Sequence, residues 1–331
     1  MKRTHRLPTV LGWLGLLALV ALLLALAWPR GDRTVLGKSF GYDIAELKRV
    51  DPKLMIGREL APIPARVLHP RALAVDGANR IYAGGENEIA VLETDGRLIR
   101  RLPVQLPVTA LAVDREGLIY VGHADRIGVL APDGAPRAEW TPPGSNAVLT
   151  SLAAAGSDLF AADAGQRLVW RLNRADGRLL GRIGARDKQR DLPGFLIPSP
   201  YFDLAIGPGG ALWVVDPGRH RLTEFSPKGN PQSSWERSGM EIGGFSGCCN
   251  PAHIAIRADG SFVTSEKGLV RIKVHAATGA LLGVLAAPDR FAADTRGIDL
   301  AVDGNGRILA LDPDKAEILV FTEAKETPCR Q

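Results

Sequence analysis

The chain has 331 residues, of which 46% are hydrophobic and 23% are charged, and its formal net charge is +5. Residues 1–33 contain five Lys and Arg and one Asp, so they carry +4 of that charge. The remaining residues are nearly neutral. This argues against electrostatic binding of a nucleic acid, and we predict no nucleic-acid partner.

A hydrophobic segment follows the basic N-terminus. Residues 10–27 contain no charged side chain, and Trp13 and Trp28 lie near its ends, as aromatic residues do at membrane interfaces. A run of this length can span a membrane as a helix. We therefore predict a single transmembrane signal anchor within residues 1–30, with the rest of the chain on the extracytoplasmic, periplasmic side. A cleaved signal peptide that ends at Ala27 is the alternative.

A spacer over residues 31–53 follows, in which residues 43–48 predict a short helix. Within residues 54–323 one phrase returns six times: an apolar residue, Ala, a second small apolar residue and, in most copies, a turn of the Asp-Gly type. Residues 324–331 form a polar tail that includes Cys329. A period of about 40–50 residues indicates a propeller or solenoid built from one unit. The phrase occupies residues 73–77, 111–114, 152–154, 204–208, 254–256 and 300–304.

Each repeat predicts a set of short antiparallel strands. In the sixth copy, apolar runs are separated by Asp303-Gly304 and Asp312-Pro313. Turn residues between short apolar runs are typical of β-hairpins. Other copies add a fourth run, and four strands make one propeller blade. The sixth copy has only three, so we predict that residues 55–60 supply its outermost strand and close the ring. The predicted fold class is an all-β, six-bladed β-propeller with the N-terminal anchor.

The phrases resemble NHL repeats, in which Ile-Ala-Val-Asp, a turn, an apolar strand ending in Asp and an Arg-Ile-x-Val-Phe strand follow one another. The resemblance covers most of the chain after the N-terminal segment. It is closest in residues 204–225, 251–274 and 300–321. It implies a six-bladed propeller, and it implies binding more often than catalysis.

Cysteine is scarce, and two of the three cysteines are adjacent. They directly precede the first strand of the fifth blade, which is innermost, so we expect them at the channel mouth. The loop after the next strand should share that face. The pair fits three roles: a strained and reducible disulfide, a thiol pair or a metal site. The ligand or redox candidates are Cys248, Cys249, Asn250, His253 and Glu266.

The register of the repeat aligns one further residue in every blade. The residue directly before each phrase is, in order, Ala72, Ala110, Ser151, Asp203, His253 and Asp299. Blades four to six therefore place ionisable side chains at one height of the channel mouth. Two neighbouring carboxylates repel each other, so we expect a raised pKa or a counter-charge between them. Protonated His253, Arg296 or a metal could each supply that charge.

Two functions fit this constellation. The first is a membrane-tethered, exported propeller that acts as a binding or scaffolding module and recognises a protein or a small molecule near Cys248, Cys249 and His253. The alternative is a metal-binding or thiol redox protein, in which these residues, with Asp203 and Asp299, hold a divalent or copper-type ion. The sequence has no nucleophile elbow, phosphate loop or zinc-protease motif, so no catalytic residue is assigned.

Overall fold

The computed structural model describes residues 44–144, 146–189, 192–292 and 294–323, together with Leu19 and Leu22. The chain divides into two units, Met1–Ile44 and Ala45–Gln331, and the propeller lies in the second. The predicted anchor of residues 10–27 falls outside the described residues except at these two leucines. Within the described ranges, no helix is both long enough and apolar enough to cross a membrane.

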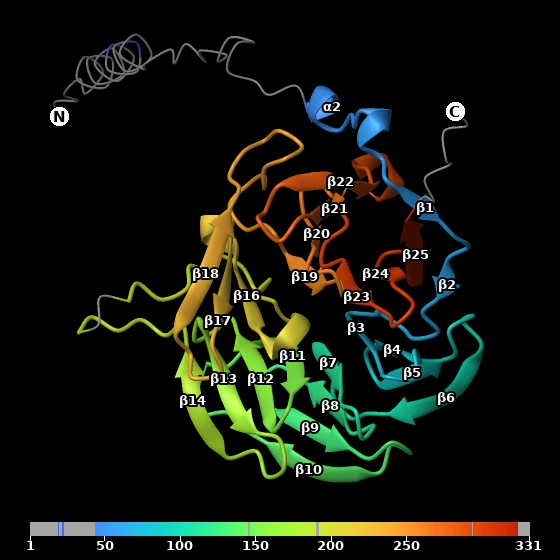
Figure 1. The fold of residues 1–331 in the computed structure, drawn as a ribbon, viewed down its shortest axis with the longest axis vertical. Coiled ribbons are helices and arrows are strands. Elements are labelled where there is room, and N and C mark those ends of the chain that lie inside the picture. Colours follow the sequence, from blue (N-terminus) through green and yellow to red (C-terminus); the bar gives the residue numbers. More distant parts are fainter. Residues whose placement is uncertain are drawn as a thin grey trace, which may run out of the picture. The chain divides into compact units, whose positions relative to one another are not determined.

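Six sheets surround a central channel, each with the first strand of its repeat innermost (Figure 1). The predicted six-bladed β-propeller is confirmed. Blades 1 to 3 consist of β3 (Ala72–Val75), β4 (Ile81–Gly84), β5 (Glu88–Leu92) and β6 (Leu98–Pro103); β7 (Ala110–Val113), β8 (Ile119–Gly122), β9 (Ile127–Leu130) and β10 (Pro136–Trp140); and β11 (Leu149–Ala155), β12 (Asp158–Asp163), β13 (Leu168–Asn173) and β14 (Leu179–Ile183).

The other three blades follow the same order. They consist of β15 (Leu204–Ile206), β16 (Leu212–Asp216), β17 (Arg221–Phe225) and β18 (Pro231–Glu236); β19 (His253–Ile256), β20 (Phe262–Ser265), β21 (Ile272–His275) and β22 (Leu281–Ala286); and β23 (Asp299–Val302), β24 (Ile308–Asp312) and β25 (Glu317–Glu323) with β1 (Gly57–Glu59) and β2 (Ile63–Pro64). The helical turns are α2 (Ile44–Leu47), η2 (Pro52–Leu54), η3 (Pro208–Gly210), η4 (Pro217–Arg219) and η5 (Pro288–Arg290). The first of these turns confirms the helix expected within residues 43–48.

The Asp that ends the repeated phrase holds the first hairpin of the blade. The Asp76 carboxylate accepts hydrogen bonds from the backbone N–H groups of Ala78 and Arg80, each at 2.9 Å. Asp114 and Asp303 bind the corresponding turns of blades 2 and 6 in the same way. A side chain that satisfies the turn's N–H groups fixes its geometry, which explains why this residue type recurs.

The ring is closed by strands from both ends of the propeller. Strand β1 pairs antiparallel with β25, with Gly57 opposite Glu323 and Glu59 opposite Phe321. This confirms the predicted closing strand and trims it to three residues. Strand β2, in which Ile63 pairs with Ile318 on the same β25, was not predicted from the sequence.

Apolar packing between blades 1 and 6 also closes the ring, in addition to the hydrogen bonds of the paired strands. One apolar cluster joins Ile81 and Leu92 of blade 1 to Leu309 and Ile318 of blade 6, and it includes Ile63 of β2. All of these side chains are buried. The junction between the last blade and the first is therefore as apolar as an ordinary core, and it buries side chains from both ends of the propeller sequence.

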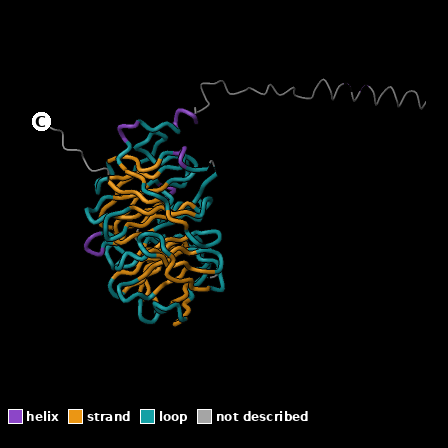
Figure 2. Tube along the Cα trace, turned by 90° about the vertical axis from the view of Figure 1, so that its right-hand side faces the viewer, coloured by secondary structure: helices purple, strands orange, loops and turns teal. Residues whose placement is uncertain are grey.

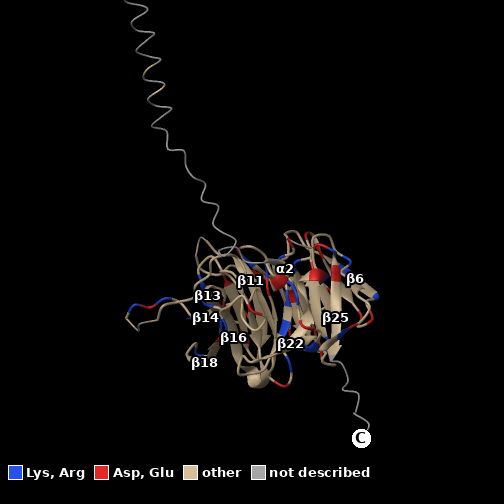
Figure 3. Cartoon of the chain, turned by 90° about the horizontal axis from the view of Figure 1, so that it is seen from above, with Lys and Arg blue, Asp and Glu red and all other residues tan. Residues whose placement is uncertain are grey.

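The loops of each blade emerge at the two ends of its strands (Figure 2). The loops before the innermost strands and those between the second and third strands share one end, which we call the mouth face. Acidic and basic residues alternate along the propeller ribbon in the view of Figure 3.

Deletion of residues 55–64, which form β1 and β2, should lower the melting temperature of the protein by roughly 10 °C, because it exposes the edge of β25 and opens the blade 6 core. Differential scanning calorimetry of the otherwise full chain measures the effect. Deletion of residues 44–50, which removes α2 and leaves β1 intact, is the control. Equal melting temperatures for the two deletions would show that β1 does not close the ring.

Candidate functional site

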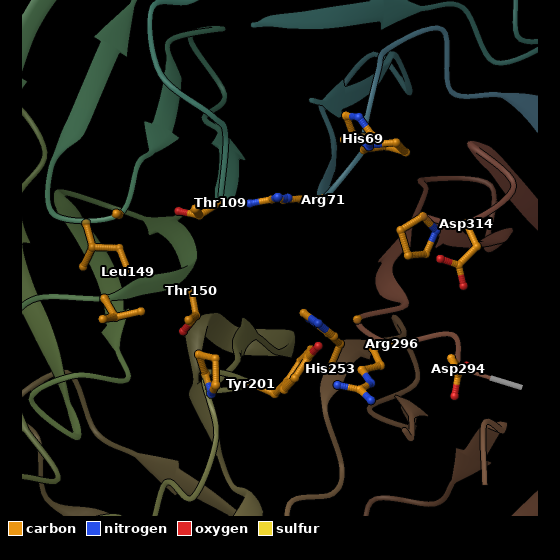
Figure 4. A pocket seen from close by; sticks show the side chains of 16 residues that line it. His69, Arg71, Thr109, Leu149, Thr150, Tyr201, His253, Asp294, Arg296 and Asp314 are labelled. Atoms are coloured by element: carbon orange, nitrogen blue, oxygen red, sulfur yellow. The ribbon is translucent and has the colours of Figure 1, made fainter. Parts of the chain in front are cut away.

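A cavity of about 610 Å³ opens on the mouth face over the channel (Figure 4). Its walls include the loops before the innermost strands of blades 1, 2, 3, 4 and 6. His253 of blade 5 contributes to its floor. A second, smaller cavity of about 180 Å³ lies along the channel and is lined by residues of the innermost strands, including Asp203 and Asp299. The predicted channel residues thus stand between the two spaces.

We call the six aligned residues Ala72, Ala110, Ser151, Asp203, His253 and Asp299 the inner belt. Neighbouring innermost strands contact each other around the whole ring. One ligand-type atom from each of Asp203, His253 and Asp299 lies within 4.8 Å of the others. The prediction that the register brings these three side chains together is confirmed.

The two carboxylates of the inner belt join neighbouring blades. Asp203 accepts the N–H of Leu204 at 2.9 Å and, across the blade boundary, the N–H of Ile254 at 2.7 Å. Asp299 accepts the N–H of Leu300 at 2.8 Å and that of Leu73 in blade 1 at 2.7 Å. Each carboxylate therefore satisfies one N–H of its own strand and one of the next strand.

His253 lies between these two carboxylates. Its Nδ1 is 3.5 Å from Asp203 Oδ2 and 3.5 Å from Asp299 Oδ1. This separation is too long for a strong hydrogen bond, and the buried Nδ1 has no partner that meets hydrogen-bond geometry. Burial lowers the pKa of His253, but the interactions with Asp203 and Asp299 outweigh it and raise the pKa above its ordinary value. Burial, aided by the charge of Asp203, raises the pKa of Asp299 to about 6.

Aromatic and basic side chains form the cavity walls above His253. The Tyr201 ring meets the His253 ring edge to face, with 6.2 Å between centroids. Burial and the nearby Cys249 raise the pKa of Tyr201, against the opposing charge of Arg296. Figure 4 shows Arg296 near His253 and Arg71 approaching the cavity from the loop of another blade. Both guanidinium groups are exposed, and neither makes an ion pair or hydrogen bond within the described residues.

The adjacent cysteines lie in the loop between β18 and β19. Neither is in a disulfide; Cys248 is exposed, Cys249 is buried, and their Sγ atoms are 3.0 Å apart. The Lys267 ammonium donates to the Ser199 hydroxyl at 2.8 Å and lies 4.5 Å from the centre of the Tyr201 ring. Burial raises the pKa of Cys249, but hydrogen bonds from Cys248, Ser199 and Lys267 outweigh it and bring the pKa below its ordinary value.

Asn250 places the cysteine loop against the loop after β20. Its side-chain amide donates to the carbonyl oxygens of Ser246 and Lys267 at 2.7 and 3.0 Å and accepts the N–H of Lys267 at 2.9 Å. His220 Nδ1 lies 3.0 Å from the Asn250 carbonyl oxygen. The expected shared face of the two loops is confirmed. The Asn250 side chain is used to hold backbone, and the cysteines are not part of the Asp203, His253 and Asp299 cluster.

Glu266 binds a buried pair of cations. Its Oε1 is 2.7 Å from Lys273 Nζ, and its Oε2 is 2.8 Å from Arg271 Nη2 and accepts the Ser246 N–H at 3.0 Å. All three charged side chains are almost completely buried, and burial lowers the pKa of Lys273 to about 8. Both carboxylate oxygens are therefore occupied by groups that hold the cysteine loop on blade 5.

Glu266 also has register equivalents in other blades. In each blade the second strand pairs with the innermost strand, and Glu266 is the residue after the partner of the inner-belt residue. At the same position blades 3 and 4 carry Asp163 and Asp216. These carboxylates accept the N–H groups of Val148 and Leu196, which lie in the preceding mouth-face loops. The acidic residue at this position has a common structural role: it ties the loop before the innermost strand to the blade.

Replacing Glu266 by Gln should lower the free energy of unfolding by about 3–5 kcal/mol, because it leaves Arg271 and Lys273 buried without an anion. Urea denaturation of the full chain measures this loss. Glu236→Gln is the matched control, since its ion pair with Arg221 is exposed and should contribute about 1 kcal/mol or less. Losses of equal size would contradict the anchoring role of Glu266.

Several residues of the site were not identified from the sequence. Arg71 and two threonines, Thr109 and Thr150, line the cavity one residue before the inner belt, so extending the register by one position would have found them. Tyr201 and Lys267 lie in loops of unequal length, where the repeat supplies no alignment. Arg296 was considered only as a counter-charge.

No protein-family model matches the chain, and no curated protein matches it. Solved structures do match. A streptogramin B lyase is similar with a TM-score of 0.53 and 17% identity, over 76% of this chain and 78% of its own. The selenomethionine form of virginiamycin B lyase from Staphylococcus aureus has a TM-score of 0.52 and 16% identity, over 81% and 88% of the two chains.

A third structure is a catalytically inactive histidine-to-alanine variant of the Staphylococcus aureus virginiamycin B lyase with quinupristin. Its TM-score is 0.56 at 14% identity, over 81% of this chain and 99% of that chain. At such identities the likeness shows a shared fold. The NHL-repeat assignment stays a prediction from the repeated phrases.

Proposed function

We propose that the protein is a ligand-binding propeller whose mouth cavity takes a small organic molecule with a negatively charged group. The observation that carries this proposal is that Arg71 and Arg296, in the walls of a cavity of about 610 Å³, have guanidinium groups with no partner among the residues that the structure describes. This volume lies within the range of small-molecule sites, which bury most of a ligand's surface.

The chemistry of the walls favours an anion with an apolar body. A guanidinium group without a protein partner offers a planar set of donors that matches a carboxylate. His253 adds positive charge when it is protonated, and Tyr201 supplies a flat ring beside it. Two acidic residues also line the cavity, but one of them, Asp314, already accepts the Thr295 hydroxyl at 2.6 Å.

Two further points bear on the proposal, one on ligand binding and one on the location of the propeller. The same fold occurs in a lyase whose structure was solved with quinupristin, so this architecture is compatible with a bound small molecule. The uncharged stretch of residues 10–27 favours a tether that holds the propeller on the extracytoplasmic side of a membrane. The proposal is therefore a membrane-tethered binding propeller.

The test uses the purified full chain and a panel of aromatic and aliphatic carboxylic acids, each paired with its methyl ester. Acids that bind should raise the melting temperature, and their neutral esters should not. For the best acid, titration calorimetry should show affinity reduced about tenfold in each of Arg71→Gln and Arg296→Gln, because a charge-assisted hydrogen bond contributes about 1.5 kcal/mol or more.

Arg137→Gln is the control, since Arg137 is exposed on the outermost strand of blade 2, away from the cavity. It should bind like the unaltered protein. Acids and esters that bind equally well, or cavity variants that match Arg137→Gln, would refute the proposal.

A bound cation at the inner belt is a second candidate. It is favoured by the unsatisfied Nδ1 of His253 and by its 3.5 Å distance from one oxygen of each carboxylate. Two donors bound to one zinc ion at about 2.1 Å in a tetrahedron lie about 3.4 Å apart. Each of these oxygens accepts one backbone N–H and keeps a second lone pair for a metal.

Elemental analysis after zinc loading and dialysis tests this candidate on the full chain. About one zinc ion per chain should remain, and His253→Ala should lose it because the imidazole is a ligand. His69→Ala, at the exposed cavity rim, should keep the ion. Zinc retained equally by His253→Ala would rule out the site.

A further inference from the structure

Cys248 and Cys249 form a second, separate site beside the mouth cavity. We propose that this pair carries out thiol–disulfide exchange with small disulfides, with Cys248 as the attacking thiol and Cys249 as the resolving thiol. The inference does not depend on the ligand-binding role of the cavity, because neither cysteine lines it.

The exposure of the two sulfurs assigns their roles. Cys248 is exposed, so an external disulfide can approach it, whereas Cys249 is buried and is reached only by its neighbour. The two Sγ atoms are 3.0 Å apart, so they need to approach by about 1 Å to form a bond. Attack from outside therefore falls on Cys248, and closure falls on Cys249.

The surroundings of Cys249 stabilise a thiolate. Lys267 supplies a positive charge, and Ser199, which accepts a hydrogen bond from Lys267 at 2.8 Å, supplies a hydroxyl. The Asn250 side chain accepts the N–H of Lys267 and donates to its carbonyl oxygen, so this loop is fixed beside the cysteines. The hydrogen bond with Cys249 and the charge of that neighbour raise the pKa of Cys248, so the proton of the pair resides on the exposed sulfur.

The spacing in the chain indicates a reversible bond. Adjacent Cα atoms are about 3.8 Å apart across a trans peptide, whereas disulfides usually join Cα atoms about 4.4–6.8 Å apart. A bond between neighbours is therefore strained, and strained disulfides are readily reduced. Such a bond suits exchange better than it suits a permanent link.

The exchange balances in two steps. In the first step a proton passes from the Cys248 thiol to the Cys249 thiolate, and the Cys248 thiolate attacks one sulfur of the disulfide RSSR. A Cys248–SR bond forms and the RS–SR bond breaks. The leaving RS⁻ then takes the proton from Cys249. The Cys249 thiolate then attacks the Cys248 sulfur and expels the second RS⁻, which takes a proton from water. The protein loses two electrons, and RSSR gains them as two thiols.

The test uses the full chain carrying Cys329→Ser, so that only the pair retains thiols, and glutathione disulfide is the probe. The released glutathione is removed by dialysis as it forms, because the strain of the closing bond otherwise favours the mixed disulfide. Under these conditions the pair should release two molecules of glutathione and show no adduct by intact mass. Cys249→Ser should stop at one glutathione held on Cys248. Cys248→Ser should react at least about tenfold more slowly, because its remaining sulfur is buried. A stable adduct on the unaltered pair, or equal rates for the two serine variants, would overturn the proposal.

Lys267 supplies an independent check. Lys267→Gln should slow the second step several-fold at neutral pH, because loss of the positive charge raises the pKa of Cys249 and leaves less thiolate. The rate of this variant should recover at higher pH. Lys267→Arg should retain the rate, as should Lys228→Gln on an exposed turn. The Arg71→Gln variant, which tests the cavity, should exchange normally, so failure of one proposal is distinguishable from failure of the other. A rate insensitive to Lys267→Gln at every pH would contradict the role of its charge.

Discussion

The pairing of β1 with β25 is the constraint on which the remaining structure depends. Blades of a propeller meet at the axis only when the ring is closed. Here the first and last blades are joined by hydrogen bonds both at the outer edge of the ring and near its axis. On the outside, Arg58 lies opposite Thr322 in an antiparallel ladder. Near the axis, the Asp299 carboxylate accepts the N–H of Leu73 across the same junction. The proposed cavity has Arg71 on one side of that junction and Arg296 on the other, so its shape is a consequence of closure.

The polar side chains near the axis divide into those that complete the backbone and those left over. Asp203 and Asp299 each satisfy two N–H groups, and Glu266 satisfies one N–H and two buried cations. Buried polar groups are normally satisfied in this way. His253 and Thr109, which both line the mouth cavity, are different, because the His253 Nδ1 and the Thr109 Oγ1 are buried without a partner of good geometry among the described residues. The place where the repeat fails to satisfy its own polar atoms is the place where a ligand, a proton or an ion has something to bind.

Periodicity explains what the sequence could and could not predict. A fixed register was enough to bring Asp203, His253 and Asp299 together, because strands of equal offset reach the axis at equal height. The same reasoning fails at β21 and the residue before it, where Arg271, Lys273 and His275 alternate with apolar residues. Such alternation is typical of a solvated strand face. Here the face is buried because the long loop between β18 and β19 lies over it. The repeat carries no information about an insertion of this kind, nor about the arrangement of Tyr201, Lys267 and the cysteines that depends on it.

The order of the closing strands has a consequence for biosynthesis. A chain leaves the ribosome from its N-terminus, so β1 is among the first strands made and its partner β25 is the last. The intervening hairpins are local and can fold as they emerge, whereas Gly57 remains unpaired until Glu323 has been synthesised. Arg71 and Arg296 of the cavity, and the Asp299 carboxylate with the Leu73 N–H, are brought together when the ring closes in that final event. A ligand that fits the cavity therefore recognises completed molecules, and a chain that stops before Glu317 has neither a closed ring nor a mouth.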